Sequence, residues 1–236
     1  MALNESGYAI IELPEIGEEL IESFDRLVAD PYIGNGNRYR RFSQYKMSFS
    51  GEAWKFHLLP HRPYMTFPKY NKVAGGIKRY YEPLEVDFTS FIDAGAKSIP
   101  LDTSDEWQIN VHQYRVITNS EVVGVTVPEG PHQDGHDYVM IAVIRRNCVT
   151  GGEMSLLPVG GEGEAFFKTT VLDGQAALLD DRRMFHYVSE IEPMEEGGHR
   201  DIFVIAFSRW ADRWHGDDFE KKVIGKSEPS PAAEGL

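Results

Sequence analysis

The sequence predicts a mainly β protein with flanking helices, an α+β chain whose core is a double-stranded β-helix, or jelly roll. From about residue 106 onward, short runs rich in β-branched and aromatic residues follow one another, separated by turn residues. No helix-length amphipathic segment alternates with these runs, which argues against a parallel βαβ sheet. Short antiparallel strands with irregular connections are typical of jelly rolls. We therefore expect the core barrel to span residues 106–215.

The part before the barrel, residues 1–105, is expected to support it with two helices and intervening strands. Apolar residues recur at helical spacing over residues 15–30, and Asp-Pro closes that segment. A second helix is predicted over about 83–97, with a proline near its start. Residues 31–82 are rich in glycine, proline and aromatic side chains and are predicted as strands and loops.

The predicted barrel consists of eight β-rich runs. In order, they are EWQINVHQYRVI (106–117), VVGVTVP (122–128), DYVMIAVIRRN (137–147), GEMSLLPV (152–159), AFFKTTVL (165–172), GQAALLD (174–180), FHYVSEI (185–191) and RDIFVIAFSRW (200–210). The tail GKSEPSPAAEGL (225–236) is rich in proline and serine and is predicted to be disordered, so residues 1–224 form one domain.

Composition and charge exclude several classes of protein. The formal net charge of −13 argues against a nucleic-acid partner, because phosphate backbones favour basic surfaces. A single cysteine excludes a disulfide within the chain and a cysteine-based metal cluster. The sequence begins without a basic segment followed by an apolar one, and no apolar stretch approaches the length of a membrane span. We expect a soluble cytoplasmic protein with no membrane or nucleic-acid partner.

One segment, NRYRRFSQYKM (37–47), is locally basic and aromatic. Such a pattern could face an anion or a stack of bases. Arg38 and Arg40 share one face of the predicted strand and could line the mouth of a site. We interpret the segment as a strand with one solvated face.

Residues 131–137, PHQDGHD, are the strongest candidate for a metal site. On a strand, His132 and Asp134 point to the same side, whereas Gly135 favours a turn or bulge that takes His136 into the loop beyond. A third ligand from elsewhere would complete the 2-His-1-carboxylate triad of non-haem Fe(II), which leaves coordination positions open. The alternative is a polar turn at the surface.

His186 is the candidate for the third ligand, because a histidine between Phe185 and Tyr187 on a strand would otherwise be costly to bury. Arg200 follows fourteen positions later at the head of the last strand. Its planar, always-charged fork suits the distal carboxylate of a dicarboxylate, with Arg209 as the fallback. Iron, open positions and an arginine together describe a site for 2-oxoglutarate.

With these motifs the chain resembles the Fe(II)/2-oxoglutarate-dependent dioxygenases and, among them, the bacterial hydroxylases of free L-amino acids that are like L-isoleucine dioxygenase. The resemblance implies a jelly roll of the cupin-like type, His132, Asp134 and His186 as catalytic iron ligands, and Arg200 as the 2-oxoglutarate anchor. It also implies O2 as co-substrate, ascorbate as a reductant in vitro, and release of succinate and CO2. The segments that carry it are VHQYR (111–115), PHQDGHD (131–137), GGEMSLLP (151–158), MFHYVSEIEP (184–193) and HRDIFVIAFS (199–208).

Two positions depart from the pattern of that superfamily, and a third argues against one activity within it. His136 has no counterpart in it and is predicted to lie near the metal or the substrate. Ile202 stands where a serine or threonine commonly helps to bind the cofactor carboxylate. Ala206 stands where a nucleic-acid demethylase would have a second arginine, which argues against that activity.

A free amino acid needs a cation for its carboxylate and an acceptor for its ammonium group. The alternation in NVHQYRV places Arg115 and Gln113 on one strand face, and both are candidates for binding the substrate. Asp181, or else Asp180, is the candidate acceptor for the ammonium group. His136 is a further candidate for substrate contact.

Other readings stay open at this level. A cupin-like metal protein such as an isomerase would keep the barrel and the metal without Arg200. A sensor would bind 2-oxoglutarate without hydroxylation, and a peptide or protein hydroxylase would use the same centre on a larger substrate. The sequence leaves open whether a carbon or a sulfur atom is oxidised. The chain could also form a homodimer.

Overall fold

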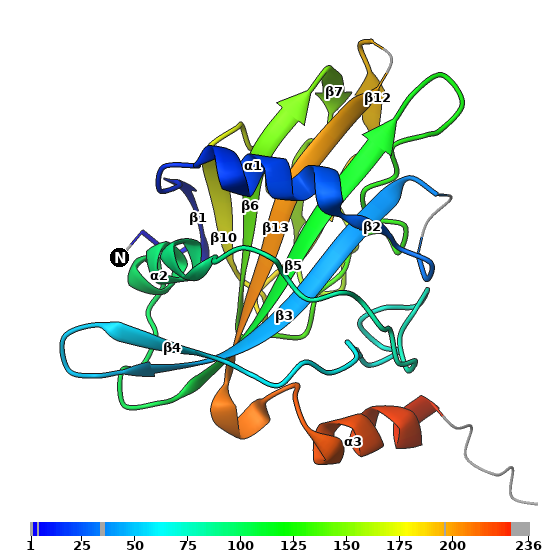
Figure 1. The fold of residues 1–236 in the computed structure, drawn as a ribbon. Coiled ribbons are helices and arrows are strands. Elements are labelled where there is room, and N and C mark those ends of the chain that lie inside the picture. The colour runs from blue at the N-terminus through cyan, green and yellow to red at the C-terminus, as the bar shows by residue number, and fades with distance from the viewer. Residues whose placement is uncertain (1, 4, 34–35, 196, 228–236) are drawn as a thin grey trace, which may run out of the picture.

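The computed structural model describes residues 2–3, 5–33, 36–195 and 197–227 (Figure 1). Strands make up most of it and short helices flank them, so the prediction of a mainly β chain with flanking helices is confirmed. The elements are β1 (Tyr8–Glu12), α1 (Glu18–Ser23), the 3-10 helix η1 (Phe24–Arg26), β2 (Val28–Ala29), β3 (Arg38–Phe49), β4 (Trp54–Leu58), α2 (Thr89–Ser98), β5 (Trp107–Thr118), β6 (Tyr138–Asn147), β7 (Val149–Gly151), β8 (Met154–Leu157), β9 (Phe167–Thr169), β10 (Gln175–Asp180), β11 (Phe185–Val188), β12 (Ile191–Pro193), β13 (Gly198–Arg209), the 3-10 helix η2 (Trp210–Asp212) and α3 (Asp217–Ser227).

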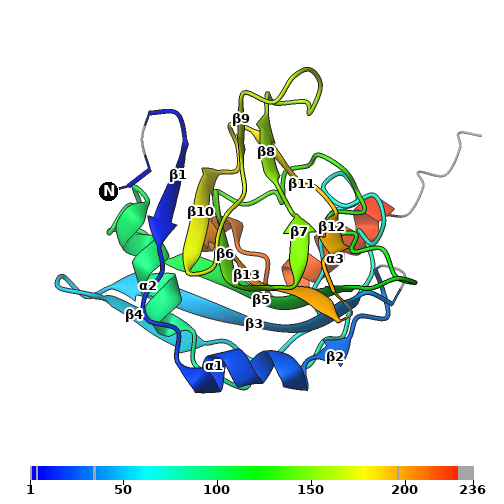
Figure 2. The same ribbon diagram turned by 90° about the horizontal axis from the view of Figure 1, so that it is seen from above.

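The strands form one large sheet and two small ones. The large antiparallel sheet has the order β1-β10-β6-β13-β5-β3-β2, with β4 paired to β3. The small sheets have the orders β11-β8-β9 and β12-β7. Figure 2 shows the layers: α1 and α2 lie on one side of the large sheet, and the small sheets lie on the other.

Both faces of the large sheet are covered, one by α1 and α2 and the other by the small sheets (Figure 2). Neighbouring residues along a strand point to opposite faces, so each strand contributes side chains to both of these interfaces. On β13, Phe203 and Phe207 join the apolar cluster that includes Phe24 of η1 and Phe91 of α2. The alternate positions, such as Ile202, face the small sheets and join a second cluster. The side chains between the large sheet and the small sheets therefore surround an interior space, and the candidate site lies there.

The prediction of a solvated face on residues 37–47 is wrong. Strand β3 is buried over most of its length, and Arg38, Arg40 and Arg41 are all buried. The covering segments come from distant parts of the sequence: Arg38 donates to the carbonyl of Thr126, and Arg41 donates to that of Pro83. Pairing with segments so far away leaves no signal in the local pattern.

Both predicted helices are shorter than expected. Within residues 15–30, the α-helix occupies only Glu18–Ser23, continues as η1, and gives way to extended backbone at Leu27. Within residues 83–97, the helix begins only at Thr89, and Pro83 lies before it in a segment without regular secondary structure.

Two further segments differ from the expectation. Residues 122–128 contain no strand, only an isolated bridge between Gly124 and Ile191. The helix α3 was not predicted, and it includes residues 225–227 of the expected disordered tail, whereas residues 228–236 lie outside the described residues.

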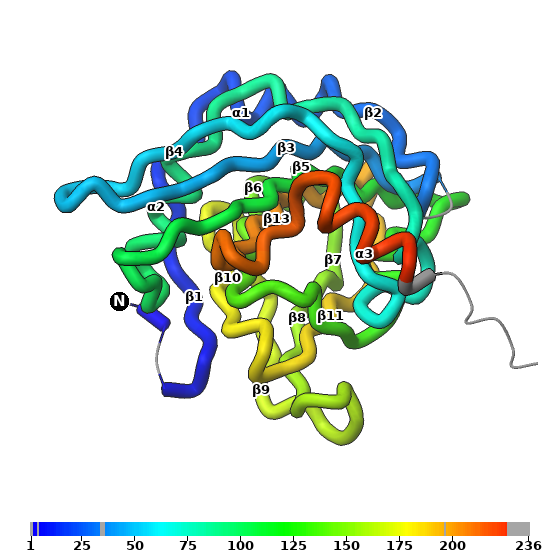
Figure 3. Tube along the Cα trace, turned by 90° about the horizontal axis from the view of Figure 1, so that it is seen from below, coloured from blue at the N-terminus to red at the C-terminus, as the bar shows by residue number. Residues whose placement is uncertain are grey.

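Helix α3 packs on the loop that precedes α2 (Figure 3). Phe219 and Val223 of the helix and Trp214 before it form an apolar cluster with Met65, and Phe67 packs against this cluster. Within the described part of the chain, no helix is long and apolar enough to cross a membrane.

The carboxylate of Asp201 is a test of how the buried ion pairs support the sheet. Asp201 is 0 % exposed and accepts hydrogen bonds from Arg115 Nε at 2.6 Å and Arg145 Nη2 at 3.2 Å. Replacing Asp201 by Ala removes a buried acceptor of Arg115 and Arg145 and leaves Arg115 only the exposed Asp25, so we expect the free energy of unfolding in urea to fall by about 1–3 kcal/mol. Asp105→Ala, which removes an exposed pair with Arg209, should change it by less than about 1 kcal/mol. Equal effects of the two substitutions would contradict this expectation.

Candidate metal centre

Two imidazoles and one carboxylate meet at the wall of the interior space. His132 Nε2 lies 3.3 Å from Asp134 Oδ1, and His186 Nε2 lies 3.6 Å from Asp134 Oδ2. The three ligand atoms all lie within 4.8 Å of one another. Bonds of about 2.0–2.2 Å to one ion place neighbouring ligand atoms about 3 Å apart, so the spacing fits a single metal ion. The structure thus brings together the three residues that the sequence predicts as ligands.

The backbone fixes the two histidines relative to each other. His132 and His186 form an isolated antiparallel bridge, in which the N–H of each donates to the carbonyl of the other at 3.1 and 2.9 Å. His186 belongs to β11, whereas His132 and Asp134 belong to the loop before β6. The prediction that His132 and Asp134 lie on a strand is therefore wrong; one bridge takes the place of that strand.

Asp181 holds the loop from behind. Its carboxylate accepts the backbone N–H groups of Asp134, Gly135 and His136 at 3.1, 2.7 and 3.1 Å. Gly135 has a φ of +87°, and a Cβ there would lie 2.3 Å from the Tyr70 ring, so a glycine is required at this turn. The turn that the sequence predicts at Gly135 is confirmed.

The protonation of the centre follows from this packing. Burial disfavours a charged His132, but its hydrogen bond with Asp134 and the charge of Asp134 outweigh burial and raise its pKa to about 9. Burial and the nearby His132 lower the pKa of His186 to about 4. Burial and the charge of Asp134 raise the pKa of Asp181 to about 7. The Nδ1–H of His132 donates to the carbonyl of Gly130 at 3.0 Å, which leaves Nε2 free to bind a metal.

His136 lies in the same loop but is not part of the triad. Its Nδ1 lies 2.7 Å from Ser208 Oγ and its Nε2 lies 3.3 Å from Asn110 Nδ2, so both ring nitrogens have partners. Its ring packs on Trp214 with centroids 4.2 Å apart. Burial lowers the pKa of His136 to about 4, so it lines the site as a neutral side chain beside the metal ligands.

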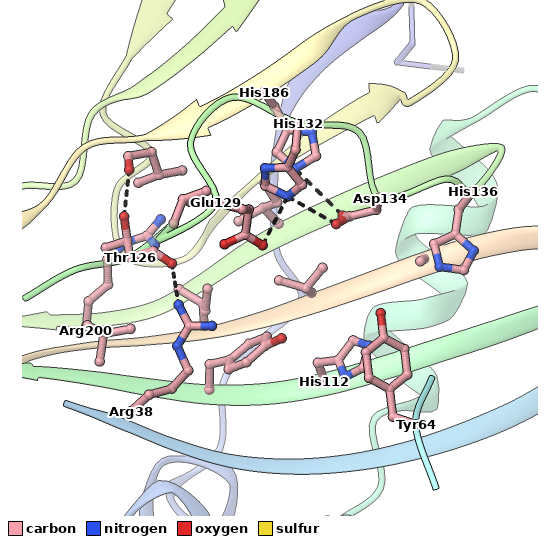
Figure 4. A pocket seen from close by; sticks show the side chains of 18 residues that line it. Arg38, Tyr64, His112, Thr126, Glu129, His132, Asp134, His136, His186 and Arg200 are labelled. Carbon is pink, nitrogen blue, oxygen red and sulfur yellow. Dashed lines mark hydrogen bonds and ion pairs between the residues drawn. The ribbon is translucent and has the colours of Figure 1, made fainter. Parts of the chain in front are cut away.

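The triad opens on a cavity of about 100 Å³ between the large sheet and β11 (Figure 4). Arg200 of β13 lines this cavity and is 2 % exposed. Within the described residues its guanidinium makes no hydrogen bond or ion pair, and its Nε is buried without a partner. Burial and the neighbouring Arg146 lower its pKa to about 10, which leaves it charged at neutral pH. A buried, unpaired cation at a cavity wall is suited to bind an anion.

Arg38 and Glu129 also line the cavity, and the sequence did not predict a functional role for Glu129. Arg38 Nη2 donates to the carbonyl of Thr126, and its Nε has no partner. Glu129 Oε1 accepts from Asn71 Nδ2 and lies 4.0 Å from His132 Nε2. The sequence shows a glutamate two residues before PHQDGHD, but whether its side chain points into the site depends on the conformation of the loop, which the sequence does not reveal.

The predicted substrate contacts other than His136 lie outside the cavity. Arg115 faces away from the cavity and pairs with Asp25 and Asp201. Gln113 Nε2 donates to Ser23 Oγ at 2.8 Å on that same far face. Asp181 is 1 % exposed and holds the backbone of the loop, so it offers no acceptor to the cavity. Asp180 and Arg209 likewise do not line the cavity: Asp180 pairs with Arg182, and Arg209 lies near Asp105.

The donor set is suited to Fe(II). Two imidazole nitrogens and one carboxylate oxygen on one side of an ion form a facial triad, and the cavity on the other side leaves room for further ligands. The unpaired Arg200 in the same cavity fits the carboxylate of an acidic ligand.

Comparison with protein families gives one match over most of the chain. A family model described as 2OG-Fe dioxygenase matches residues 21–206. No curated protein sequence is similar enough to count as a relative.

Several solved structures are similar to this one. A bsmA homolog from Methylobium petroleophilum PM1 is 26 % identical with a TM-score of 0.69, over 81 % of this chain and 80 % of that one. IDO from Bacillus thuringiensis is 18 % identical with a TM-score of 0.63, over 86 % and 91 % of the two chains. The Fe(II)/(alpha)ketoglutarate-dependent dioxygenase TqaL is 17 % identical with a TM-score of 0.58, over 90 % and 86 %. The last two likenesses concern the fold alone.

Removing one ligand should strongly weaken metal binding. We expect Asp134→Ala to weaken the binding of Mn(II) at least about 100-fold, because losing a direct ligand costs more than losing an outer partner. His136→Gln should keep the affinity within a few-fold, since His136 is not part of the triad. Isothermal titration calorimetry of both variants, with circular dichroism as a check of folding, measures this. A larger loss in His136→Gln than in Asp134→Ala would contradict the assignment of the ligands.

Metal binding should also release a proton. In the metal-free protein, the pKa of about 9 keeps His132 protonated at pH 7, and this proton must leave before Nε2 binds a metal. His186, with a pKa of about 4, is already neutral and contributes none. The affinity for Mn(II) should therefore rise about tenfold per pH unit between about pH 6 and 8. Calorimetry in buffers of different ionisation enthalpy counts the released protons, and a count near zero would contradict the expectation.

Proposed function

The chain belongs to the 2OG-Fe dioxygenase family, and we propose that it hydroxylates, or oxidises at sulfur, a free L-amino acid. Members of this family use Fe(II) and 2-oxoglutarate, and the chain carries a His-Asp-His site for the iron. Fe(II) on these ligands would supply the oxidation chemistry, in which 2-oxoglutarate and O2 are converted to succinate and CO2 while one oxygen atom enters the substrate. The protein supplies binding, orientation and a dry cavity.

The iron ligands in this proposal are His132, Asp134 and His186. Asp134 carries the negative charge that balances the metal, and Asp181 holds its backbone in place. The carbonyl of Gly130 orients His132 through Nδ1, so that Nε2 faces the other two ligands. This protein framework keeps the ligand atoms close together before any metal binds.

The unpaired charge of Arg200 is the observation that carries the assignment of the second cofactor. A guanidinium that is 2 % exposed and has no partner among the described residues is costly to bury, unless an anion pairs with it. We infer that Arg200 binds the distal carboxylate of 2-oxoglutarate. Arg38 lies at the same level of the sheet, because both Arg38 and Arg200 pair with Val116 of β5. In this proposal Arg38 supplies the polar contact that Ile202 does not.

The position and charge of the site support a small substrate. The cavity lies between two sheets and is lined by side chains from both, which favours a metabolite over a folded protein. Its walls combine apolar residues such as Ile141 and Val204 with a few charged groups, as a site for an aliphatic amino acid requires. The segments that resemble amino-acid hydroxylases favour the same class.

We also infer that the strands on both sides of the cavity form the double-stranded β-helix predicted from the sequence. The large sheet supplies Arg200 and the small sheet supplies His186, so the site lies between the two layers. This arrangement supports the jelly-roll reading, in which ligands bind inside the barrel.

The proposal is tested by a mass-spectrometric screen of the purified protein with Fe(II), ascorbate, O2 and 2-oxoglutarate against free L-amino acids. We expect succinate and a product one oxygen atom heavier to form together with one class of amino acid, and both to be lost in Asp134→Ala. Succinate without an oxygenated amino acid would move the substrate to another class. Iron binding without succinate would favour the cupin-like alternative.

Replacing Arg200 should act on 2-oxoglutarate. A charge-assisted hydrogen bond is worth about 1.5–3 kcal/mol, so Arg200→Met should raise the dissociation constant of 2-oxoglutarate about 10- to 100-fold. Calorimetry on the Mn(II)-loaded protein measures the constant without turnover. Arg209→Ala, at the exposed end of the same strand, is the matched control and should leave it unchanged. Loss of affinity in Arg209→Ala instead would transfer the role to that residue.

A further inference from the structure

The cavity has a second polar end, four residues along the strands from Arg200. On β5, Val116 pairs with Arg200, whereas His112 pairs with Val204 of β13 and Phe42 of β3. Four residues of strand correspond to about 13 Å. Figure 4 shows Arg200 toward one end of the cavity and His112 with Tyr64 toward the other, with the three metal ligands between them.

His112 carries its proton on a fixed nitrogen. Its Nδ1 lies 2.7 Å from Nη2 of Arg40. A guanidinium can only donate, so Nδ1 must accept, and the proton of the neutral ring lies on Nε2. Burial, together with the charges of Arg40 and Arg79, holds the pKa of His112 well below its usual value. The imidazole is therefore a neutral N–H donor throughout the physiological pH range.

The ring of His112 is also held in place. It stacks on Phe42 with centroids 4.6 Å apart and meets the edge of Tyr64 at 4.5 Å. Its Nε2 makes no hydrogen bond within the described residues, although the side chain lines the cavity. The donor is thus fixed in direction and has no partner from the protein.

Tyr64 supplies a second donor beside it. Its hydroxyl has no hydrogen-bond partner in the part of the chain that the structure describes, and its side chain lines the cavity. Burial raises the pKa of Tyr64, so the hydroxyl stays protonated. Arg79 and Arg40 lie over its ring, with guanidinium carbons 4.5 and 5.1 Å from the centroid.

These two arginines place positive charge behind the donors. Both are buried and neither lines the cavity. Asp30 lies 3.7 Å from Arg40, and Nε and Nη2 of Arg79 have no partner. Asp134 faces the same region, but it is a metal ligand. Two cations, of which only Arg40 has a carboxylate within 4 Å among the residues described, thus stand behind two neutral donors, which favours an anion at this end of the cavity.

We propose that His112 Nε2–H and the Tyr64 hydroxyl bind a carboxylate group of the substrate at this end of the cavity, in front of Arg40 and Arg79. This subsite rests on the proposed function, because it names the group by which a free amino acid is held. Carboxylates occur on both the substrate and 2-oxoglutarate. The four C–C bonds of 2-oxoglutarate span at most about 6 Å, less than half the separation of the two ends, which favours the substrate.

The test compares carboxylates with their amides on Mn(II)-loaded protein with 2-oxoglutarate under nitrogen. The probes are L-amino acids with aliphatic, polar and aromatic side chains, their amides, and the matching carboxylic acids without the ammonium group. In the wild type, calorimetry should give at least one carboxylate that binds about tenfold or more tightly than its amide. Tyr64→Phe should lower this ratio about three- to tenfold, and His112→Phe should lower it further.

Matched variants separate recognition from folding. His112→Gln keeps an N–H donor and should restore part of the ratio, whereas Tyr80→Phe changes an exposed tyrosine and should leave it unchanged. His112→Phe leaves Arg40 without its acceptor, so thermal unfolding and Mn(II) affinity of each variant are measured alongside. Tyr64→Phe removes a hydroxyl that has no protein partner, so it tests the subsite even where His112→Phe unfolds.

The outcomes distinguish the subsite from the proposed function. The subsite is overturned if no carboxylate binds more tightly than its amide, or if the ratio persists in Tyr64→Phe and His112→Phe. It is also overturned if the variants weaken 2-oxoglutarate instead, because the carboxylate would then be the cofactor's. Hydroxylation of an amino acid with an unchanged ratio leaves the function standing and removes the subsite. If plain carboxylic acids bind through His112 but no amino acid is oxidised, the subsite is supported and the proposed substrate class is wrong.

A second readout needs no ligand. Nitrogen-15 NMR of labelled histidine should show the proton of His112 on Nε2 and no titration between about pH 5 and 8. A proton on Nδ1, or a charged ring at pH 6, would remove the fixed donor and overturn the proposal.

Discussion

One buried carboxylate determines whether the metal centre can form. Asp181 accepts three consecutive backbone N–H groups of the loop that carries His132 and Asp134. Apart from those bonds, and as far as the structure describes the chain, the backbone of residues 132–136 is held only by the bridge between His132 and His186. Asp181 follows β10 of the large sheet, and His186 belongs to β11 of the small sheet. The centre is therefore held from both layers, and its position reflects how the layers pack.

The interior space differs from an ordinary core in its buried positive charge. Arg38 and Arg200 lie at one end, and Arg40 and Arg79 lie behind the other. Buried charges without partners destabilise a folded protein, unless an opposite charge or hydrogen bonds offset the cost of removing them from water. Here the two ends flank a metal centre, so both can receive anionic groups on either side of it. These buried charges lower the stability of the ligand-free fold, as expected of a site whose two ends each bind an anionic ligand.

The sequence predicts the chemistry of the site better than its surroundings. His132, Asp134 and His186 follow from residue type and order, and the alternation along β5 correctly separates His112 from Arg115 by face. Which of those faces meets the cavity depends on partners far away in sequence, such as Asp201, 86 residues after Arg115. For the same reason, the local sequence pattern could not predict that β3 is buried or that Asp181 binds the backbone of the loop. The helix over 15–30 is shorter than predicted because apolar spacing reports a buried face and not where the backbone leaves helical angles.

We propose that one cavity holds Fe(II) on His132, Asp134 and His186 and 2-oxoglutarate on Arg200. The decisive experiment is a crystal structure obtained without oxygen, with Fe(II) and 2-oxoglutarate added. We expect anomalous iron density between the three ligand atoms and a carboxylate of 2-oxoglutarate on the Arg200 guanidinium. Iron bound at other residues, or 2-oxoglutarate lying with its distal carboxylate at His112 and Tyr64, would contradict this proposal.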